Sequence, residues 1–596
     1  MTKAVLMDGF FKRGLVIDVT TQSSHTIAFD DALLSRTLGG KGLATQLLLD
    51  MIPAGTDPLS PENVLIFAVG PITGTSVWGS CRYGVFTKSP QTGCYCESYS
   101  GGTTAEYISA TGYDAVIITG ATERPIWIEI NETGATFHPA DNLWGKETYA
   151  TEDHVKEAIQ TLRGQTSGAV VIGPAGEALN RFAVIENDYW RSAGRTGVGA
   201  VLGSKHIKAL AFHGSAKRPI ADPAGLRAFT KSMAEIGKTD KGVAAYKKCG
   251  TSMLVDVMNE VGGFPTRYWQ KGRCDHKDAI NASALHSRCD VKPRACRKCY
   301  MACGRLATIK DGPHAGLTVE GPEYETIYAF GGLCEISSIE DIIYLNDLCD
   351  RLGMDTITAG NLVAFAMEAK LRGRIDYPIS YGDTEAAAAL LRDMAACQGI
   401  GLILSRGIRH AASVWGLEDV AVHVKGLEPP GYDPRALKGM GLAYASSDRG
   451  ACHLRATFYK PELMGISDPR SSDDKAGEFK TWEDRLTYFD MLIVCRFYRD
   501  LYQWESLAAI TRVTTGLDLT EAEMIARASA VTDDTRQFNL KHGITREDDT
   551  LPVFLTDHAL PETGYSISRT EVENMVNDYY HVRGWTEAGE PQQASL

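Results

Sequence analysis

The sequence predicts an α+β protein whose first part is rich in strands and whose remainder is mainly helical. Up to about residue 215, short runs of β-branched and aromatic residues are bounded by glycine, proline or polar turns, which is the pattern of strands. Beyond this point apolar residues recur three and four positions apart, which is the period of amphipathic helices. A change of period at one place indicates separate strand-rich and helix-rich parts.

The strand-rich part contains one expected hairpin and one expected helix. The hairpin lies in PIWIEINETGATFHPA, with its turn at residues 131–134. The helix lies in KETYATEDHVKEAIQTLRG. The other runs that we expect to form strands are GLVIDV, NVLIFAV, YGVFTK, DAVIITG, AVVIGPAG and HIKALAF.

Two loop-like breaks divide the chain. The stretch GSAKRPIADPAG, residues 214–225, is typical of a linker, and GLEPPGYDPRALKG, residues 426–439, forms a second break. The predicted domains are therefore residues 1–215, 216–425 and 426–596.

Three helices are expected between these breaks. The first lies in SSIEDIIYLNDLCDRLGMD, where Ser337 has the position of an N-cap and Glu340 completes a capping box. The others lie in TAGNLVAFAMEAKLRGRI and TEAAAALLRDMAACQG.

Composition limits the class of protein. A net charge of −13 disfavours nucleic acid as the main partner, because phosphate binding needs a clustered basic face. Charges interrupt the N-terminal stretch, and no window approaches 18 uninterrupted apolar residues, so neither a signal peptide nor a membrane span is expected. We expect a cytoplasmic protein, in which the 14 cysteines are thiols or metal ligands rather than disulfides.

The stretch RACRKCYMACGR places Cys296, Cys299 and Cys303 in the pattern C-x2-C-x3-C. Thiolates at this spacing bind zinc or an iron–sulfur cluster. Zinc sites usually present two close pairs, whereas no second pair follows here, so the spacing favours a four-iron cluster over zinc or no metal. Spacing does not choose the fourth ligand among Cys334, Cys349, Cys397, Cys452 and Cys495.

The stretch SAGRTGVGAVLGSK, residues 192–205, places four glycines around an expected helix start. Backbone N–H groups there can approach phosphate oxygens, and Arg195 can bind them with both arms of its guanidinium. Taken alone, Gly197 and Gly199 fit a dinucleotide site or a closely packed turn equally well.

Two further stretches, DRLGMD and DMLIVC, accompany long blocks such as DPLSPENVLIFAVGPITGTS, EGPEYET and YDPRALKGMGLAYASSDRGACH. Together and in this order, they resemble the tungsten-containing aldehyde:ferredoxin oxidoreductases over nearly the whole chain. In that family the motifs D-x-x-G-L-D and D-x-x-G-L-C each hold a pterin, and the second ends in the fourth cluster cysteine. The resemblance implies that Asp350, Gly353, Asp355 and Asp490 bind the pterins and that Cys495 binds the cluster.

The resemblance also implies a fold and its cofactors. A β-rich N-terminal base domain carries two mainly helical domains, with tungsten or molybdenum held by two pyranopterins at their interface. A magnesium ion bridging the pterin phosphates and one [4Fe-4S] cluster complete the set. Arg82 matches the family arginine between cluster and pterin, although a lone arginine more often forms a surface salt bridge. Arg195, Gly197 and Gly199 match the cofactor loop.

Two residues match the catalytic positions of the family. Glu325 would take a proton, with its pKa raised by burial, and His453 would donate a hydrogen bond to the reacting oxygen. Tyr324 would be a further donor. Without the resemblance, a salt-bridged Glu325 and a core His453 would be the ordinary interpretations.

The implied activity is oxidation of aldehydes to carboxylic acids, or the reverse. Electrons would pass through the cluster to ferredoxin or to a dedicated iron–sulfur subunit. A related aromatic acyl-coenzyme A reductase subunit and a non-catalytic electron-transfer protein remain as alternatives. Basic residues near the cysteines would dock an acidic carrier or offset the charge of the cluster; they are Lys292, Arg294, Arg297, Lys298 and Arg305.

Some positions depart from the family. Ile493 and Val494 replace the glycine and leucine of the second motif, and Tyr99 stands where an asparagine is common. Residues 344–347, YLND, lack the Glu-x-x-His that bridges two subunits in some members, so a homo-oligomer would need another route. No role is assigned to the remaining thiols near Arg82, which are Cys81, Cys94 and Cys96.

Overall fold

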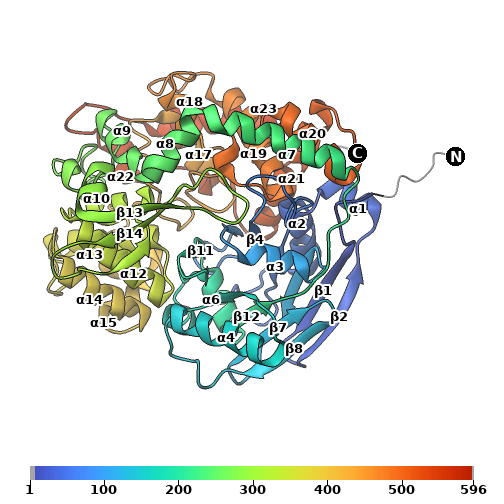
Figure 1. Ribbon diagram of the computed structural model, residues 1–596. Helices are drawn as coiled ribbons and strands as arrows, with labels where there is room; N and C mark the ends of the chain where they lie inside the picture. Colours follow the sequence, from blue (N-terminus) through green and yellow to red (C-terminus); the bar gives the residue numbers. More distant parts are fainter. Residues whose placement is uncertain (1–6, 593–596) are drawn as a thin grey trace.

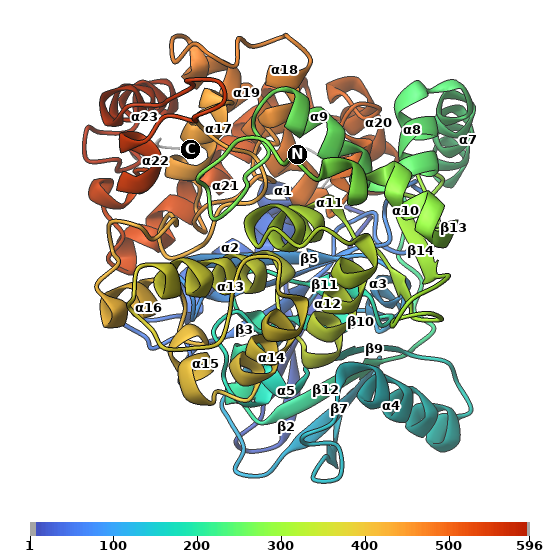
Figure 2. The ribbon, with the colours of Figure 1, turned by 90° about the vertical axis from the view of Figure 1, so that its left-hand side faces the viewer.

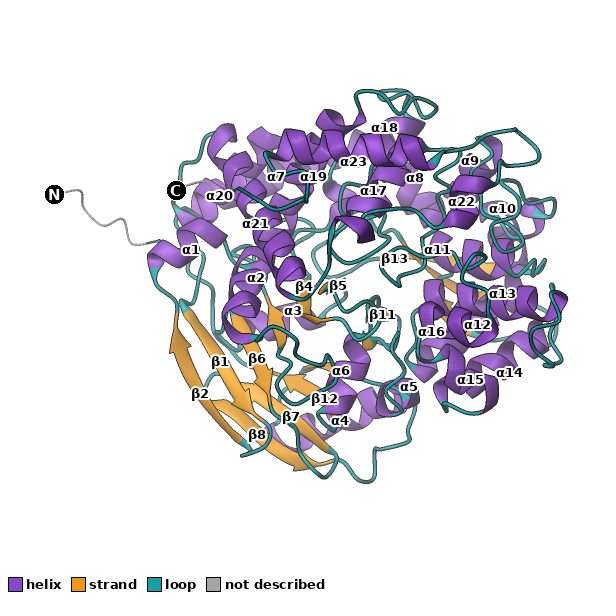
Figure 3. Ribbon diagram, turned by 180° about the vertical axis from the view of Figure 1, so that it is seen from behind, coloured by secondary structure: helices purple, strands orange, loops and turns teal. Residues whose placement is uncertain are grey.

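The computed structural model describes residues 7–592 and confirms the α+β organisation. Strands gather on one side of the molecule, and helices surround the rest (Figure 3). The last strand of the first part ends at Phe212, and the first helix of the next part begins at Pro223. Among the described residues, no helix combines the length and the apolar character needed to cross a membrane.

The first part contains two six-stranded mixed sheets, each with one parallel pair. All six expected strand runs form strands, and the expected hairpin is β7–β8. The first sheet, in spatial order, is β2 (Ser23–Ala28), β1 (Arg13–Asp18), β6 (Ala115–Thr119), β3 (Leu65–Ala68), β4 (Tyr83–Lys88) and β5 (Tyr95–Ser100). The second is β11 (Arg191–Ala193), β10 (Ile185–Asn187), β9 (Gly168–Val171), β12 (Ile207–Phe212), β7 (Ile126–Asn131) and β8 (Gly134–Pro139).

One apolar core lies between the two sheets, because alternate residues of each strand point to the same face. Phe67 of β3 and Phe212 of β12 meet there, with ring centroids 6.1 Å apart. Helix α2 (Gly40–Met51) covers the other face of the first sheet, and α4 (Thr148–Arg163) covers the other face of the second. The remaining helices of this part are α1 (Asp31–Thr37), α3 (Thr104–Ala110), α5 (Pro174–Glu177) and α6 (Val198–Ser204).

Helices of the rest of the chain enclose the open side of the sheets (Figures 1 and 2). The helices up to residue 416 are α7 (Pro223–Thr239), α8 (Lys241–Cys249), α9 (Leu254–Glu260), α10 (Ala282–Arg288), α11 (Tyr324–Thr326), α12 (Ile339–Leu352), α13 (Thr356–Leu371), α14 (Thr384–Ala395), α15 (Gly399–Leu404) and α16 (Ile408–Trp415). Those that follow are α17 (Lys438–Ser446), α18 (Tyr459–Leu463), α19 (Lys475–Leu492), α20 (Trp504–Thr515), α21 (Glu521–Lys541), α22 (Val553–Asp557) and α23 (Arg569–Arg583).

Two details of the helical part differ from expectation. The N-cap of α12 is Ser338 rather than Ser337, because the Ser338 hydroxyl accepts from the N–H of Asp341, three residues on. A three-stranded antiparallel sheet also lies in this part, where only helices were expected. Its strands are β13 (Cys289–Arg294), β14 (Gly304–Ile309) and β15 (Thr318–Glu320).

Candidate functional site

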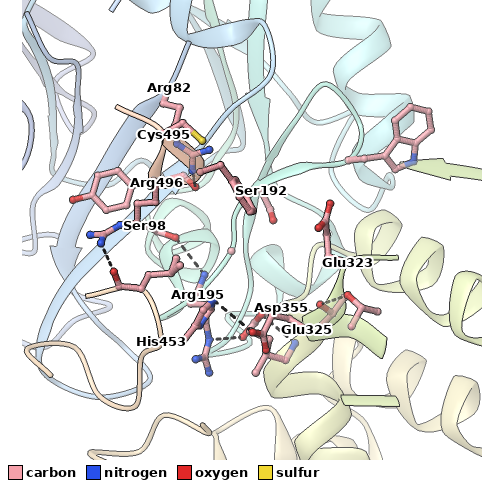
Figure 4. A pocket seen from close by; sticks show the side chains of 18 of the residues that line it. Arg82, Ser98, Ser192, Arg195, Glu323, Glu325, Asp355, His453, Cys495 and Arg496 are labelled. Atoms are coloured by element: carbon pink, nitrogen blue, oxygen red, sulfur yellow. Dashed lines mark hydrogen bonds and ion pairs between the residues drawn. The ribbon is translucent and has the colours of Figure 1, made fainter. Parts of the chain in front are cut away.

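A central cavity is lined by residues from each of the three predicted domains. It consists of two adjoining spaces of about 300 Å³ each, which share Arg82, Glu325 and His453 among their lining residues. Figure 4 shows these side chains together with others that converge on the same space. The predicted site residues that line it are Arg82, Arg195, Tyr324, Glu325, Asp350, Asp355, His453, Asp490 and Cys495.

Glu325 and His453 face one another across this cavity. Glu325 lies on α11, and His453 lies on the loop after α17, with its Nε2 3.5 Å from Glu325 Oε1. The other carboxylate oxygen of Glu325 accepts from the backbone N–H of Gly431 at 3.0 Å. Neither Glu325 Oε1 nor His453 Nδ1 has a hydrogen-bond partner among the described residues. Two buried polar atoms are therefore left to bind something in the cavity.

Burial sets the protonation of this pair. It raises the pKa of Glu325 to about 8, even though the Gly431 N–H and Arg195 act to lower it. Burial, and then Arg195 and Arg449, hold the pKa of His453 well below its usual value. At neutral pH the carboxyl is largely protonated and the imidazole is neutral, so this site can exchange a proton near physiological pH.

Tyr324 fixes the peptide that holds Glu325. Its hydroxyl donates to the carbonyl of Gly431, the residue whose N–H binds Glu325. This bond makes Tyr324 a positioning residue for the carboxylate, since its one donor is already used.

Arg195 ties together three segments beside the cavity. Its guanidinium donates to Asp355 Oδ2 at 3.2 Å, to the carbonyl of Ala451 at 3.1 Å and to that of Glu428 at 2.7 Å. Asp355 also caps the start of α13. The structure thus gives Arg195 protein partners, and only part of its donor capacity is left for a phosphate.

Gly197 and Gly199 do not line the central cavity. A Cβ at Gly197 would collide with the carbonyl of Arg181, and one at Gly199 would collide with that of Val184. Their contacts match the closely packed turn that the sequence left open, while the cofactor role remains a prediction.

Helices α12 and α19, which lead into the motifs DRLGMD and DMLIVC, both end at the central cavity. Each of these ends packs against a glycine that follows a strand, and the two strands belong to different sheets. The turn after α12 rests on Gly173, where a Cβ would overlap the carbonyl of Leu352. The turn after α19 rests on Gly70 in the same manner, against Leu492. Both glycines follow a central strand and precede a proline, in VIGPAG and AVGPITG.

The carboxylates at these two ends have different surroundings. Burial raises the pKa of Asp350 well above its usual value, with Asp347 acting in the same direction, and its side chain accepts from Asn346 at 2.7 Å. Asp490 instead pairs with Arg455, at 3.0 Å, and with Arg496. Burial alone would raise the pKa of Asp490, but the two arginines lower it.

A second, smaller cavity is lined by all four predicted cluster cysteines. Cys296, Cys299 and Cys303 belong to the loop between β13 and β14, and Cys495 follows the end of α19. Within residues 7–592, no three His, Cys, Asp or Glu side chains lie close enough together to hold a single metal ion. The four thiols thus surround a space instead of meeting at a point.

The other candidates for the fourth ligand are engaged elsewhere. Cys452 accepts hydrogen bonds from Arg449 at 3.0 and 3.2 Å, and Cys349 is fully buried in α12. Cys334 and Cys397 donate to backbone carbonyls. None of these four lines the cysteine cavity, whereas Cys81, which had no assigned role, does.

Arg82 lies between the two cavities. It lines both spaces of the central cavity and the cysteine cavity, as Figure 4 also shows for Arg82 beside Cys495. Its guanidinium donates to the carbonyl of Tyr99 at 3.2 Å. Phe497 has the same bridging position, although nothing in its sequence context singled it out.

The basic residues near the cysteines are less available to bind an acidic partner than their number in the sequence indicated. Glu106 pairs with Arg297 at 2.9 Å and with Lys298 at 3.0 Å. Arg294 pairs with Glu320 at 3.2 Å. Arg305 is buried, so this group presents a smaller positive surface than expected.

The central cavity suits a large organic cofactor with phosphate groups. Arg82, Ser98 and Ser192 offer donors for phosphate oxygens, and Asp350 and Asp490 offer acceptors for ring N–H groups. The unpartnered Glu325 Oε1 shows that the cavity has polar atoms still to be satisfied. The residues present therefore fit a pterin cofactor.

Arg455, Arg496 and Glu97 were not predicted from the sequence. Arg455 pairs with both Glu97 and Asp490, and Lys41 reaches Glu97 at 2.9 Å, so this buried network joins the first sheet to the second motif. Arg496 follows the motif cysteine directly, and that adjacency is the one signal that could have marked it.

Comparisons with known proteins agree with this architecture. Residues 14–214 match the family described as aldehyde ferredoxin oxidoreductase, N-terminal domain, and residues 227–596 match aldehyde ferredoxin oxidoreductase, domains 2 & 3. Tungsten-containing aldehyde ferredoxin oxidoreductase of Pyrococcus furiosus is 34% identical over 603 residues, which cover 99% of this chain and 98% of the relative. The protein of the same name from Thermococcus kodakarensis is also 34% identical, over 98% of this chain and 97% of its own length.

Relatives with other names share the fold. The aliphatic sulfonate oxidoreductase, WOR-like subunit, of Pyrococcus furiosus is 26% identical, over 98% of this chain and 95% of its own length. The structure of the active site complex BamBC of benzoyl coenzyme A reductase superposes with a TM-score of 0.85 at 22% identity, over 98% of this chain and 96% of its own. By its family matches and its full-length relatives, the chain belongs to the aldehyde ferredoxin oxidoreductase family.

Proposed function

We propose that this oxidoreductase converts aldehydes to carboxylic acids at a tungsten or molybdenum pterin cofactor in the central cavity. Electrons then pass through a [4Fe-4S] cluster to ferredoxin or a dedicated iron–sulfur subunit. The observation that carries the proposal is the pair Glu325 and His453, which leaves two unpartnered buried polar atoms in a cavity that Arg82 separates from four cysteines. The names of the full-length relatives support the same activity.

The cofactor would be held by residues from all three parts of the chain. Asp350 and Asp490 would accept hydrogen bonds from the two pterins, and Arg82 would bind on the side of the cluster. When bound, this cofactor supplies the metal centre that accepts two electrons. Cys296, Cys299, Cys303 and Cys495 would bind the cluster, since iron–sulfur clusters take thiolates spread around a volume.

The protein's part in the reaction is proton transfer and orientation. An aldehyde and water give a carboxylic acid, two electrons and two protons. With a pKa of about 8, Glu325 is ionised in a minor fraction of molecules at neutral pH, and in that form it takes a proton at Oε1 from the incoming water, while the Gly431 N–H holds the other oxygen in place. Neutral His453 can donate one hydrogen bond to the substrate oxygen, which orients the carbonyl and stabilises charge that develops on it.

A substitution at Glu325 tests the proposal. Glu325→Gln should lower turnover of benzaldehyde by roughly 10²- to 10⁴-fold, with little change in substrate affinity, because glutamine keeps the shape but takes no proton. Iron and tungsten contents should stay at one cluster and one metal per chain. The matched control is Glu335→Gln, an acid paired with Arg267 outside the cavity, which should retain turnover.

Two measurements distinguish the proposed activity and the proposed role of Glu325 from their alternatives. Benzoyl-coenzyme A reduction with no aldehyde oxidation would replace the proposal by a ring reductase. Near-normal turnover of Glu325→Gln would remove this residue from the mechanism, and loss of tungsten from that variant would make it a structural residue of the cofactor site.

A further inference from the structure

A third cavity, of about 490 Å³, lies apart from the site described above. It shares no lining residue with the central or the cysteine cavity. Segments distant in the sequence form it: the turn at 57–59, the turn after β4 at 90–93, Arg181, the start of α16 and Gly426. Nothing in the proposed reaction uses this space.

Positive charge dominates its lining. Three arginines line it, Arg181, Arg406 and Arg409, together with one acid, Asp57. Within the part of the chain that the structure describes, neither Arg181 nor Arg406 has a carboxylate within 4.0 Å, and Arg409 reaches Asp548 only at 3.9 Å. Burial, and then the neighbouring Arg406, lower the pKa of Arg181, which shows that the two guanidinium groups repel one another.

The helix that opens into this cavity adds to the positive charge. Helix α16 begins after Gly407, no side chain caps it, and no acidic residue lies in its first turn. Its first N–H groups therefore lack intrahelical partners, and the helix dipole is positive at this end. Arg409 occupies the first turn, where a cation is unfavourable unless an anion is present.

A buried acceptor lines the same cavity. Gln91 is 7% exposed, and its Oε1 has no hydrogen-bond partner among the described residues. The amide nitrogen donates to Glu428 at 3.0 Å and to Thr358 at 3.2 Å, which fixes the orientation of the amide. An occupant that satisfies Gln91 must bring an N–H or O–H group as well as negative charge.

We propose that this cavity binds a phosphate monoester that also carries hydroxyl or amide groups. Its phosphate would contact Arg181, Arg406 and the uncapped first turn of α16, and a donor group would reach Gln91 Oε1. The volume is larger than a bare phosphate needs and lies in the range of small-molecule sites. Guanidinium groups and a helix N-terminus are the donors that proteins use for phosphate.

Isothermal titration calorimetry on the complete, cofactor-loaded protein tests this site. Glucose 6-phosphate should bind with one site per chain, more tightly than inorganic phosphate, while glucose should not bind. Arg406→Ala and Arg181→Ala should each weaken binding tenfold or more, because each removes a charge-assisted bond. Arg124→Ala, which removes an exposed arginine that pairs with Asp141 and does not line this cavity, should bind as the original protein does.

Further results separate this site from the proposed activity. Aldehyde turnover by Arg406→Ala should equal that of the original protein, which also shows that the variant is folded. The proposal fails if no saturable binding occurs in the millimolar range, or if both arginine variants bind unchanged. Equal affinity for inorganic phosphate and glucose 6-phosphate would overturn the role of Gln91.

Discussion

The ends of α12 and α19 carry related six-residue motifs and rest on equivalent glycines, yet their electrostatic surroundings are opposite. At the end of α12, burial raises the pKa of Asp350, and its acidic neighbour Asp347 acts in the same direction. At the end of α19, Asp490 lies between Arg455 and Arg496, and its pKa is lowered. The motif places a carboxylate at the cavity, but burial and the charged neighbours of that carboxylate decide whether it is neutral or charged.

The last residues of the two motifs also differ in use. Asp355 accepts from the N–H groups that begin α13 and pairs with Arg195, so it closes a structural contact. Cys495 lines both the central and the cysteine cavity. One backbone arrangement therefore serves a helix start on one side and a wall of the cysteine cavity on the other.

The largest expected effect concerns this last position. Cys495→Ala should lose most of the iron and the EPR signal of the reduced cluster, because one thiolate ligand is removed. Cys349→Ala, at a buried cysteine on α12, should keep its iron. Full iron content in Cys495→Ala would mean that another thiol is the fourth ligand of the cluster. Cys81 would be the first candidate, because it lines the same cavity.

Replacing each of the two aspartates by asparagine should have different effects on stability at the ends of α12 and α19. Asp490→Asn should destabilise the protein by about 3–5 kcal/mol, since it leaves Arg496 without a carboxylate partner and Arg455 with Glu97 alone. Asp350→Asn should not destabilise the protein at neutral pH, because burial already favours the neutral form of this residue in the folded state. Thermal unfolding measured side by side checks the contrast; equal losses would show that charge does not distinguish the ends.

The glycine of the first motif offers a smaller test. Gly353 has a φ of +78°, and a Cβ there would lie 2.8 Å from the N of Gly173. Gly353→Ala should cost about 2–4 kcal/mol, from backbone strain and overpacking together. Gly164→Ala is the control: Gly164 ends α4 with a φ of +66° in open space, so only strain applies, about 1–2 kcal/mol. Matching shifts in the unfolding temperature would show that the contact with Gly173 is unimportant.

The smallest effect is a dependence on pH. The raised pKa of Asp350 means that its contribution to stability is complete below the ordinary aspartate pKa and is lost as the pH rises through the folded value. The lowered pKa of Asp490 means that its contribution is present above the ordinary value and is lost as the pH falls through the folded one. The free energy of unfolding of Asp350→Asn should therefore rise relative to that of the original protein as the pH increases. The destabilisation caused by Asp490→Asn should become smaller as the pH falls. The reverse trends would contradict the assigned directions.

Much of the fold could be predicted from the sequence, because its signals are local. Apolar runs between turns predicted six strands and the β7–β8 hairpin; the six strands are β1, β3, β4, β6, β9 and β12. Helical periods predicted α4, α12, α13 and α14. The hairpin that carries the cysteines was missed, since CDVKPR contains three charged residues and a proline, which are uncommon in strands. Ile493 explains one departure from the family: it takes a left-handed φ of 55°, the conformation that a glycine would supply.

The site was predicted only where the resemblance gave residues in advance. Glu325 and His453 lie 128 positions apart in the chain, and no local pattern brings them within 3.5 Å. The network of Arg455, Glu97 and Asp490 was not predicted, because a lone buried arginine has the same sequence context as one on the surface. Partners that come from different parts of the fold leave no periodic signal.

The loop between β13 and β14 bears on the order in which the protein is assembled. Its three cysteines leave the ribosome about 190 residues before Cys495 does, which at typical rates of synthesis is roughly 10–40 s. During that interval the nascent chain offers three thiols without their partner, and they are open to oxidation or to the wrong metal. We therefore expect cluster insertion to follow synthesis of the C-terminal part, and a chain shortened before Cys495 to be released without its iron.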